Sequence, residues 1–325
     1  MAYEYMLNKT CCLLFALFSS YSFATDIVFI HSYHTDYPWV KEYRGGFMDT
    51  IADHSILEYE MDTKRQPTID FDKIAKQALA FIDMKKPKLV VLADDNALKL
   101  LGPTLVEQEV PLVFLGINAN PRHYIRLNKN VSGTLERPLL KRSILMLHDL
   151  FPEMKKLKVL MDSNPTSYAI LETSFDDKFH QKISGVEVEI SLEKTFNDWK
   201  INTESLKDNH YDALIIANYA ALTDDQKQNV SLDEVSEWTS KNTPVPLFAF
   251  WGYSIGKGKA IGGLIISGVQ QGVDAAKKVN QYFMTGKLPA ITTPVRGSLM
   301  FSEYELKRWD IEAKSKILNN SLILE

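Results

Sequence analysis

Short apolar runs alternate along the chain with longer segments whose apolar residues recur at helical spacing. The runs that predict strands are residues 26–32, 57–62, 88–94, 111–118 and 130–135, followed by 156–162, 186–192, 211–219, 246–251 and 259–267. Most are apolar throughout instead of alternating, which is typical of parallel strands covered on both faces. The pattern therefore predicts an α/β fold with doubly wound parallel sheets.

Amphipathic patterns between these runs predict the helices. They cover residues 71–86, 96–108, 139–152, 169–183, 232–242 and 270–287. Pro87, Pro103 and Pro111 mark element boundaries, Pro152 ends one helix and Gly286 ends the last. The alternation of strand and helix occurs twice, without a fixed-period repeat or a long Gly/Ser linker. We therefore predict two α/β lobes with a cleft between them.

The N-terminus has the pattern of a secretory signal, residues 1–24. Residues 13–18 form an apolar core that is too short to span a bilayer, and residues 22–24 have the small-x-small pattern of a cleavage site. The alternative is an uncleaved N-terminal anchor. Cys11 and Cys12 precede the apolar core, so they do not form a lipoprotein cleavage box. Cleavage after Ala24 leaves no cysteine in the mature chain, which we expect in the periplasm.

Charge and composition narrow the class of partner. The formal net charge is −4, with 24% charged and 45% hydrophobic residues. This mild acidic balance without basic runs argues against a nucleic-acid partner. No second segment contains the roughly 18 consecutive apolar residues of a membrane helix.

Polar, aromatic or glycine residues follow six of the predicted strands. In an open parallel sheet, ligands bind outside the carboxyl ends of the strands, so these positions form the candidate ligand-binding site. The candidates are Ser32, Tyr33, His34, Trp39, Asp94, Asp95, Asn96, Asn118, Asp162, Asn164, Asn218, Tyr219 and Trp251. Helix capping is the alternative role for Asp94 or Asp95, and surface packing is the alternative for Tyr33 and Trp39.

The sequence contains no catalytic or cofactor motif that meets its chemical requirements. Residues 252–260 resemble a phosphate loop, but no Ser or Thr follows Lys257 or Lys259 to bind magnesium. His31 and His34 are three residues apart, but the HExxH pattern is absent. We therefore expect a binding protein without cofactor or metal, not an enzyme. The alternative is a secreted hydrolase that uses Asp94 or Asp95.

Four stretches resemble type I periplasmic binding proteins of an uncharacterised group of ABC-transporter substrate-binding proteins. They are residues 93–102, 111–121, 131–138 and 259–289. The resemblance implies two Rossmann-like lobes, three hinge strands and a small ligand clamped between the lobes. The chain would cross between lobes near Gly133, Gly268 and Pro294. Lobe 1 would then comprise residues 25–133 and 268–293, and lobe 2 residues 134–267 and 294–325.

The two ends of the mature chain resemble a sensory branch of this group. Residues 31–47 are similar to the start of periplasmic sensing regions of some histidine kinases and diguanylate cyclases. Near the other end, the similar positions are Leu306, Arg308, Trp309, Ile311, Leu318 and Ser321. The resemblance implies that a membrane sensor kinase or cyclase reads the closed form, with an ABC permease as the alternative partner. Because the sequence stops at Glu325 without a membrane segment, we expect that partner to be a separate protein.

Aromatic residues narrow the ligand class. Tyr33 and Trp39 are suited to stack on a flat or apolar ligand, while Ser32, His34 and Asn118 supply hydrogen bonds. These features fit an aromatic or hydrophobic small molecule, such as an aromatic amino acid, and fit a sugar equally well. We expect Tyr33, Asp95 and Asn118 of lobe 1 to meet Asn164, Asn218 and Trp251 of lobe 2.

Overall fold

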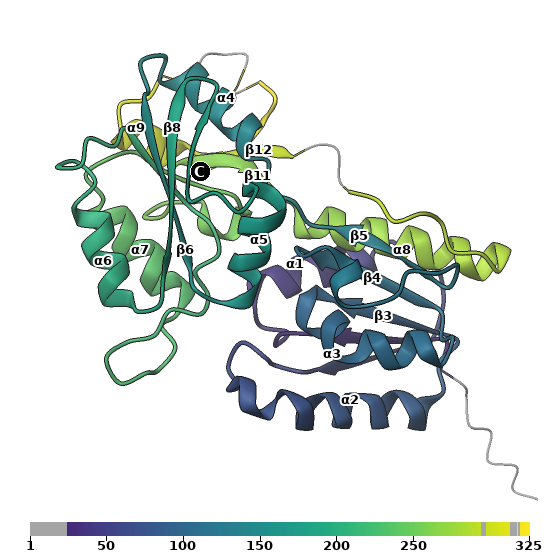
Figure 1. The fold of residues 1–325 in the computed structure, drawn as a ribbon. Helices are drawn as coiled ribbons and strands as arrows, with labels where there is room; N and C mark the ends of the chain where they lie inside the picture. The colour runs from purple at the N-terminus through teal and green to yellow at the C-terminus, as the bar shows by residue number, and fades with distance from the viewer. Residues whose placement is uncertain (1–24, 294–296, 313–316, 318) are drawn as a thin grey trace, which may run out of the picture.

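Two β-sheets, each with helices against its faces, build the two lobes of the protein (Figure 1). The structure is a computed structural model that describes residues 25–293, 297–312, 317 and 319–325. The expected signal segment with Cys11 and Cys12, the expected crossing at Pro294, and Leu318 lie outside the described residues. Within the described ranges, no helix combines the length and the apolar character needed to cross a membrane.

Lobe 1 is a three-layer arrangement around a parallel sheet. Its strands are β1 (Ile27–His31), β2 (Ile56–Glu60), β3 (Leu89–Ala93), β4 (Leu112–Ile117) and β5 (Val131–Leu135), in the order β2-β1-β3-β4-β5. Its helices are α1 (Pro38–Met48), α2 (Phe71–Lys85), α3 (Asp94–Glu107) and α8 (Gly268–Thr285). Figure 1 shows α2 and α3 on one face of the sheet and α1 and α8 on the other.

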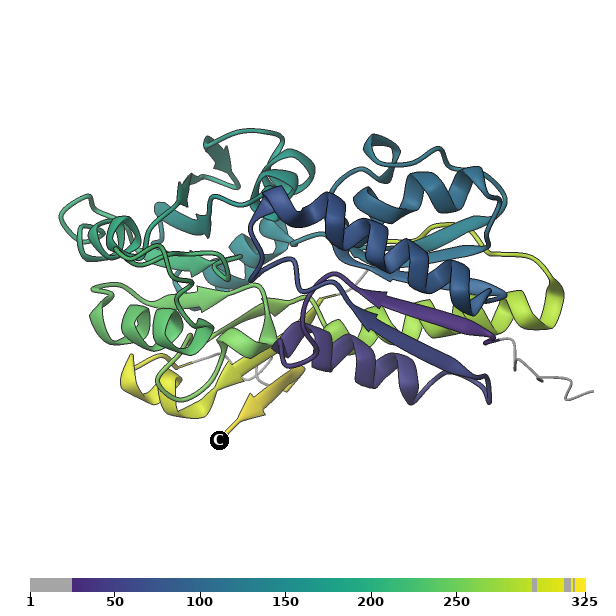
Figure 2. The ribbon, with the colours of Figure 1, turned by 90° about the horizontal axis from the view of Figure 1, so that it is seen from below.

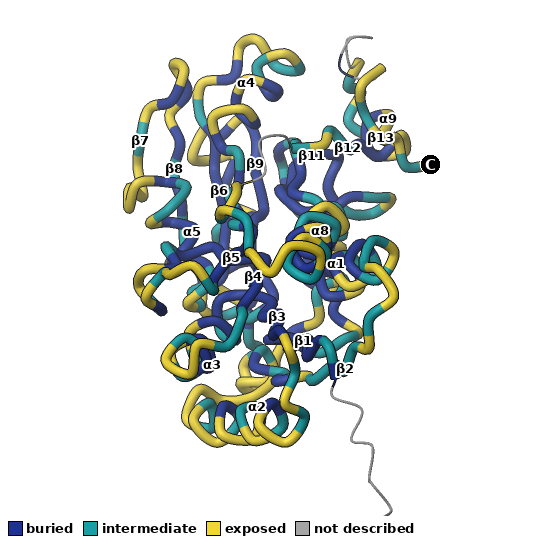
Figure 3. The backbone as a smooth tube through the Cα atoms, turned by 90° about the vertical axis from the view of Figure 1, so that its right-hand side faces the viewer, coloured by how far each residue is buried: buried dark blue, intermediate teal, exposed yellow. Residues whose placement is uncertain are grey.

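The covering of both faces explains the apolar runs of lobe 1. Phe29 belongs to the core beneath α1 and α8, whereas its neighbour Ile30 belongs to the core beneath α2 and α3. Every residue of β1, β3 and β4 is buried, while β2 at the edge of the sheet is only partly buried. In Figure 3, the central strands are accordingly dark blue and the outer side of α2 is yellow.

Lobe 2 contains a larger, mostly parallel sheet. Its strands are β6 (Lys156–Asp162), β7 (His180–Ile183), β8 (Val186–Glu193), β9 (Ala213–Ile216), β10 (Leu247–Ala249), β11 (Gly262–Ile265), β12 (Ser298–Ser302) and β13 (Ser321–Leu324). Its helices are α4 (Leu140–Leu150), α5 (Pro165–Phe175), α6 (Phe196–Glu204), α7 (Leu232–Asn242) and α9 (Glu303–Arg308). The strand order is β13-β12-β11-β10-β9-β6-β8-β7, and the pairs β7–β8 and β11–β12 are antiparallel. The lobes lie side by side in Figure 2.

Two sequence predictions need correction. The helix predicted over residues 169–183 ends at Phe175, where Asp176 and Asp177 take positive φ of 56° each, and residues 180–183 form β7 instead. Ser184 and Gly185 then make the tight turn into β8, with φ of 50° and 90°. Pro103 does not mark an element boundary, because it lies inside α3.

We propose the lobe boundaries that the sequence suggests, with one detail at the first crossing. The expected crossing at Gly133 falls inside β5, which continues to pair with β4 as far as Leu135. Glu136 and Arg137 then begin the segment that leads into α4 of lobe 2. The return near Gly268 coincides with the start of α8.

Candidate functional site

A small cavity lies between the lobes at the carboxyl ends of strands from both sheets. We call this space of about 20 Å³ the inner cavity. All five strands of lobe 1 contribute to it, because Tyr33, Lys64, Asp94, Asn118 and Glu136 follow β1, β2, β3, β4 and β5 in turn. The remaining lining residues are Tyr37, Trp39, Thr166, Asn218, Trp251 and Tyr253. The topology thus brings polar and aromatic side chains from distant parts of the sequence together at one point.

A second cavity of about 170 Å³, the outer cavity, adjoins the inner one. The two share Tyr33, Lys64 and Thr166 as lining residues, so these side chains separate them. Of the sequence-predicted site residues, the inner cavity brings together Tyr33, Trp39, Asp94, Asn118, Asn218 and Trp251, and the outer cavity adds Asn96 and Asn164.

Ser32 and Asp95 do not line either cavity and instead fix the loops that do. The Ser32 hydroxyl donates to the Ala93 carbonyl at 2.6 Å and accepts from the Ala97 amide at 2.8 Å. The Asp95 carboxylate accepts the backbone N–H groups of Asn118 and Ala119, both at 2.9 Å. These bonds connect the start of α3 to the ends of β1 and β4.

Asp162, Tyr219 and His34 also lie outside both linings. Asp162 Oδ1 accepts from the Ser167 hydroxyl at 2.6 Å and from Asn218 Nδ2 at 3.0 Å, so it orients a cavity residue. Tyr219 is hydrogen-bonded to Ser254 at 2.7 Å in the core of lobe 2. His34 Nδ1 contacts the Asp62 carboxylate at 3.2 Å.

Two indole N–H groups hold the carboxyl groups that face the inner cavity. Trp39 Nε1 donates to Asp94 Oδ1 at 2.9 Å, and Trp251 Nε1 donates to Glu136 Oε1 at 2.8 Å. Asn118 Nδ2 donates to Glu136 Oε2 at 2.9 Å. Burial raises the pKa of Asp94 well above its usual range and raises the pKa of Glu136 to about 8.

Two acceptor atoms in this arrangement have no partner among the described residues. They are Asp94 Oδ2 and Asn118 Oδ1, and both are buried. An unpaired buried polar atom costs free energy, so it marks a position where a ligand or water completes the hydrogen bonding. Asp94 also has a left-handed φ of 68°, and Gly116 is required beside it because a Cβ there would lie 2.7 Å from Asp94 Oδ1.

Aromatic rings and one lysine complete the inner cavity. Tyr33 and Tyr37 meet edge to face at a centroid distance of 5.6 Å, and the Tyr37 hydroxyl lies 3.5 Å from that of Tyr253 across the lobes. Lys64 Nζ lies 4.4 Å from the centroid of Tyr33 and 5.0 Å from that of Tyr37. Burial lowers the pKa of Lys64, while the charges of Asp162, Asp94 and Glu136 oppose that shift.

Sequence reasoning missed Lys64 and Glu136, although a signal for both was present. They follow β2 and β5, whose ends are not among the six strand ends that supply the candidates. Tyr37, Thr166 and Tyr253 also line the inner cavity and are absent from the candidate set, although Tyr37 and Tyr253 lie in the same polar and aromatic stretches as Trp39 and Trp251.

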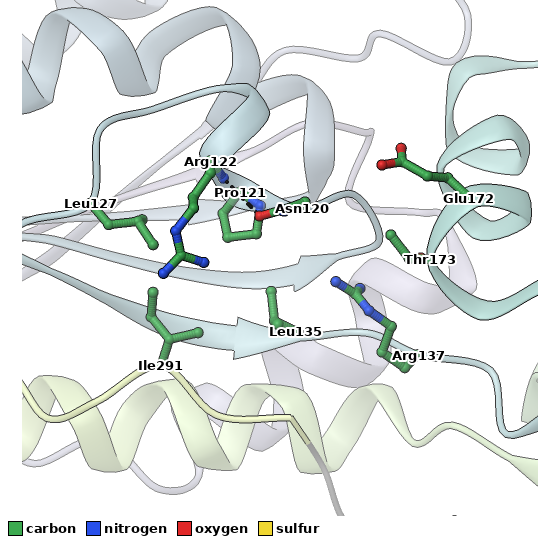
Figure 4. A pocket seen from close by; sticks show the side chains of 9 residues that line it. All are labelled: Asn120, Pro121, Arg122, Leu127, Leu135, Arg137, Glu172, Thr173 and Ile291. Carbon is green, nitrogen blue, oxygen red and sulfur yellow. Dashed lines mark hydrogen bonds between the residues drawn. The ribbon is translucent and has the colours of Figure 1, made fainter. Parts of the chain in front are cut away.

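A larger cavity of about 520 Å³ shares no lining residue with the inner cavity (Figure 4). Arg122 extends into it from lobe 1 and Arg137 from the segment that follows β5, while Glu172 and Thr173 face it from α5. Arg137 is already engaged, because its guanidinium donates to the Ile117 carbonyl at 2.7 Å and to the Ala119 carbonyl at 3.1 Å. We assign the candidate site to the inner cavity, because its buried acceptors lack partners.

No family model and no curated protein sequence match this chain. Solved structures do match. A conserved domain protein from Vibrio cholerae has a TM-score of 0.68 and 15% identity, covering 93% of this chain and 100% of its own. An ABC domain in complex with L-Trp from Streptococcus pneumoniae has a TM-score of 0.66 and 14% identity, covering 92% of this chain and 100% of its own.

A third similar structure is a 5-methylthioribose transporter solute binding protein from Thermotoga lettingae. Its TM-score is 0.55 at 12% identity, and the match covers 90% of each chain. These matches and the two parallel-sheet lobes agree with the expectation from the sequence: the chain has the two-lobed fold of type I periplasmic binding proteins.

Proposed function

We propose that this chain is a periplasmic solute-binding protein that clamps a small molecule between its lobes and presents the closed form to a membrane partner. The observation that carries the proposal is the inner cavity, where Asp94 Oδ2 and Asn118 Oδ1 are buried without partners and aromatic rings converge from both lobes. A ligand that bridges these groups gains contacts with both lobes only when they close.

Binding without chemistry fits the roles of the acidic residues. A hydrolase would need a carboxylate free to act as base or nucleophile, yet Asp95 accepts two backbone N–H groups. Two solved structures of similar fold also support a binding role, since one contains L-Trp and another is a 5-methylthioribose transporter solute binding protein. An aromatic amino acid and a sugar are therefore both reasonable classes for a first ligand screen.

Small-angle X-ray scattering tests the clamping. The protein is titrated with a metabolite panel, and the cognate ligand is expected to reduce the radius of gyration. A panel that produces no compaction, together with measured turnover of any substrate, contradicts the proposal.

The membrane partner is proposed as a sensor kinase or cyclase, with an ABC permease as the alternative. Support comes from the sensory resemblance of residues 31–47 and of the C-terminal segment. Crosslinking in membranes, with and without ligand, followed by identification of the captured protein, separates the two. Capture of a permease, with loss of solute uptake on deletion, argues for transport. Capture of a kinase or cyclase, with uptake intact, argues for sensing.

A further inference from the structure

Two hydrogen-bond acceptors of the inner cavity lack a donor among the described residues. Trp39 and Trp251 use their N–H groups on the outer oxygens of Asp94 and Glu136. Asp94 Oδ2 and Asn118 Oδ1 remain buried without a donor among the described residues. A ligand that donates to Asn118 Oδ1 and to an ionised Asp94 Oδ2 completes this arrangement.

The charges around the cavity favour a cation. The acidic side chains of Asp94 and Glu136 line it, and Asp162 lies close enough to act on the same lysine. Lys64 is the only cationic side chain in the inner lining. Burial raises the pKa of both carboxyls because it disfavours their charged forms; a protonated amine bound between them would stabilise the carboxylates, whereas an anionic ligand would disfavour them further.

Lys64 already places an ammonium group at this point. Its Nζ lies over the rings of Tyr33 and Tyr37, at 4.4 Å and 5.0 Å from their centroids, an arrangement typical of cation–π contacts. No carbonyl or side chain of the described residues accepts a hydrogen bond from it. The ammonium is therefore held by rings and by longer-range charge alone, which makes it a displaceable occupant.

We propose that the ligand binds through a protonated amine that takes the place of the Lys64 ammonium between Tyr33, Tyr37 and Asp94. This inference rests on the proposed function and names the ligand class, a small organic ammonium ion. Lys64 acts as an internal competitor that occupies the cation position.

Displacement of Lys64 also provides room for the ligand. Its side chain lines both the inner cavity of about 20 Å³ and the outer cavity of about 170 Å³. When it moves toward the outer side, the two spaces become continuous. The ammonium end of the ligand then lies on the inner side, and the rest of the molecule extends toward Asn96, Asn164 and Phe71.

Calorimetry on Lys64→Met tests the competition. The probes are phenethylammonium, 2-phenylethanol and phenylacetate, which share a ring and differ in charge. Removing the competing charge is expected to lower the Kd for phenethylammonium at least about tenfold, while the Kd for 2-phenylethanol stays the same. Lys76→Met, at an exposed position of α2 in the same lobe, is the matched control and should bind like wild type. Adding Asp94→Asn to Lys64→Met should abolish the gain.

Several outcomes overturn the inference. The first is that Lys64→Met binds the amine and the alcohol with equal affinity. The second is that the Kd for the amine does not change in Lys64→Met. The third is that wild type binds phenylacetate and Lys64→Met does not. The last result would make Lys64 a receptor for a ligand anion. Lys64→Gln repeats the test if the methionine variant does not fold.

Compaction of wild type by a neutral or anionic metabolite overturns this inference and leaves the proposed function intact. Amine binding without compaction contradicts the clamping and supports the inference.

Discussion

At the scale of single residues, Trp251 joins the two lobes through one side chain. It is 4% exposed, its indole N–H donates to Glu136 at 2.8 Å, and its ring lines the inner cavity. Glu136 follows β5 of lobe 1 and Trp251 follows β10 of lobe 2. This one hydrogen bond therefore couples the ligand site to the relative position of the lobes.

Replacement of Trp251 by alanine should weaken ligand binding. The change removes a buried aromatic wall and leaves Glu136 Oε1 without its donor, so we expect a loss of about 1–3 kcal/mol in binding free energy. Isothermal calorimetry with the cognate ligand measures it. Trp238→Ala is the matched control, since Trp238 packs against Phe196 in lobe 2, away from the cavity. Unchanged affinity in Trp251→Ala would remove this residue from the site.

Glu136 should make the stability of the protein depend on pH. Burial raises its pKa to about 8 in the folded chain from an ordinary value of 4.5, so the folded state binds more protons between these values. Stability therefore falls as pH rises from about 4.5 and levels off above about 8. Each unit of pKa difference corresponds to roughly 1.4 kcal/mol.

Glu136→Gln should reduce this slope, because the glutamine stays neutral at every pH. Urea unfolding of wild type and variant between pH 5 and pH 9 measures the effect. Glu153→Gln, at an exposed position, should keep the slope of wild type. Identical slopes for wild type and Glu136→Gln would show that this carboxyl does not titrate as its burial implies.

The sequence alone predicts the location of this site better than its chemistry. The strand-end rule selects Tyr33, Asp94 and Asn118, which line the inner cavity because parallel strands bring their carboxyl ends to one edge. It does not reveal which side chains turn inward. Asp95 follows Asp94 directly, yet Asp95 binds backbone N–H groups and Asp94 faces the cavity. Helix geometry sends neighbouring side chains in different directions, and the sequence pattern does not record which of them meets the other lobe.

At the scale of elements, α1 and α8 cross at very short distance on the face of the lobe 1 sheet. A Cβ at Gly46 of α1 would lie 2.1 Å from the Val269 carbonyl oxygen, and one at Gly272 of α8 would lie 1.9 Å from the Tyr43 carbonyl oxygen. These contacts are with backbone atoms, which do not rotate away. Glycine at both positions therefore permits the close packing of the two helices.

Adjacent glycines in α1 provide a matched pair for this crossing. Gly46→Ala should lower the free energy of unfolding by about 1–3 kcal/mol or more, because the methyl group forces the helices apart. A Cβ at Gly45 meets nothing within 4 Å, so Gly45→Ala should raise stability by roughly 0.5–1 kcal/mol through helix propensity. Chemical denaturation measures both. Equal effects of the two substitutions would contradict the crossing.

Elements with strong periodicity were predicted well, and those that depend on their context were not. The apolar runs of β1, β3 and β4 are recognisable because both faces of each strand are buried. β7 is the counterexample. Its residues are mostly exposed or half-buried, and it forms only because β8 offers an antiparallel edge beside it. A short exposed strand of this kind has no apolar pattern, so the sequence favoured an extension of the preceding helix.

At the scale of the whole molecule, side-chain contacts connect the lobes on both sides of the inner cavity. Tyr37 meets Tyr253, with a hydroxyl separation of 3.5 Å. The Thr173 hydroxyl donates to the Asn118 carbonyl at 2.8 Å, and His123 Nδ1 lies 3.6 Å from Glu172 Oε1. These contacts are polar, and a hinge motion that separates the lobes would break them.

A protein whose lobes are locked together should be recognised by the proposed membrane partner even without ligand. Both cysteines of the sequence precede residue 25, so residues 25–325 offer a cysteine-free background for new pairs. In His123→Cys/Glu172→Cys, a short bis-maleimide can join the two exposed positions across the lobes. If the partner reads the relation between the lobes, the locked protein should be crosslinked to that partner in membranes without added ligand.

Two controls make this outcome specific. His123→Cys alone, treated with the same reagent, should require ligand for capture, as wild type does. The double variant without reagent should behave in the same way, because its lobes remain free to separate. Capture by the locked protein that still depends on ligand would mean that the partner reads the ligand site itself and not the arrangement of the lobes.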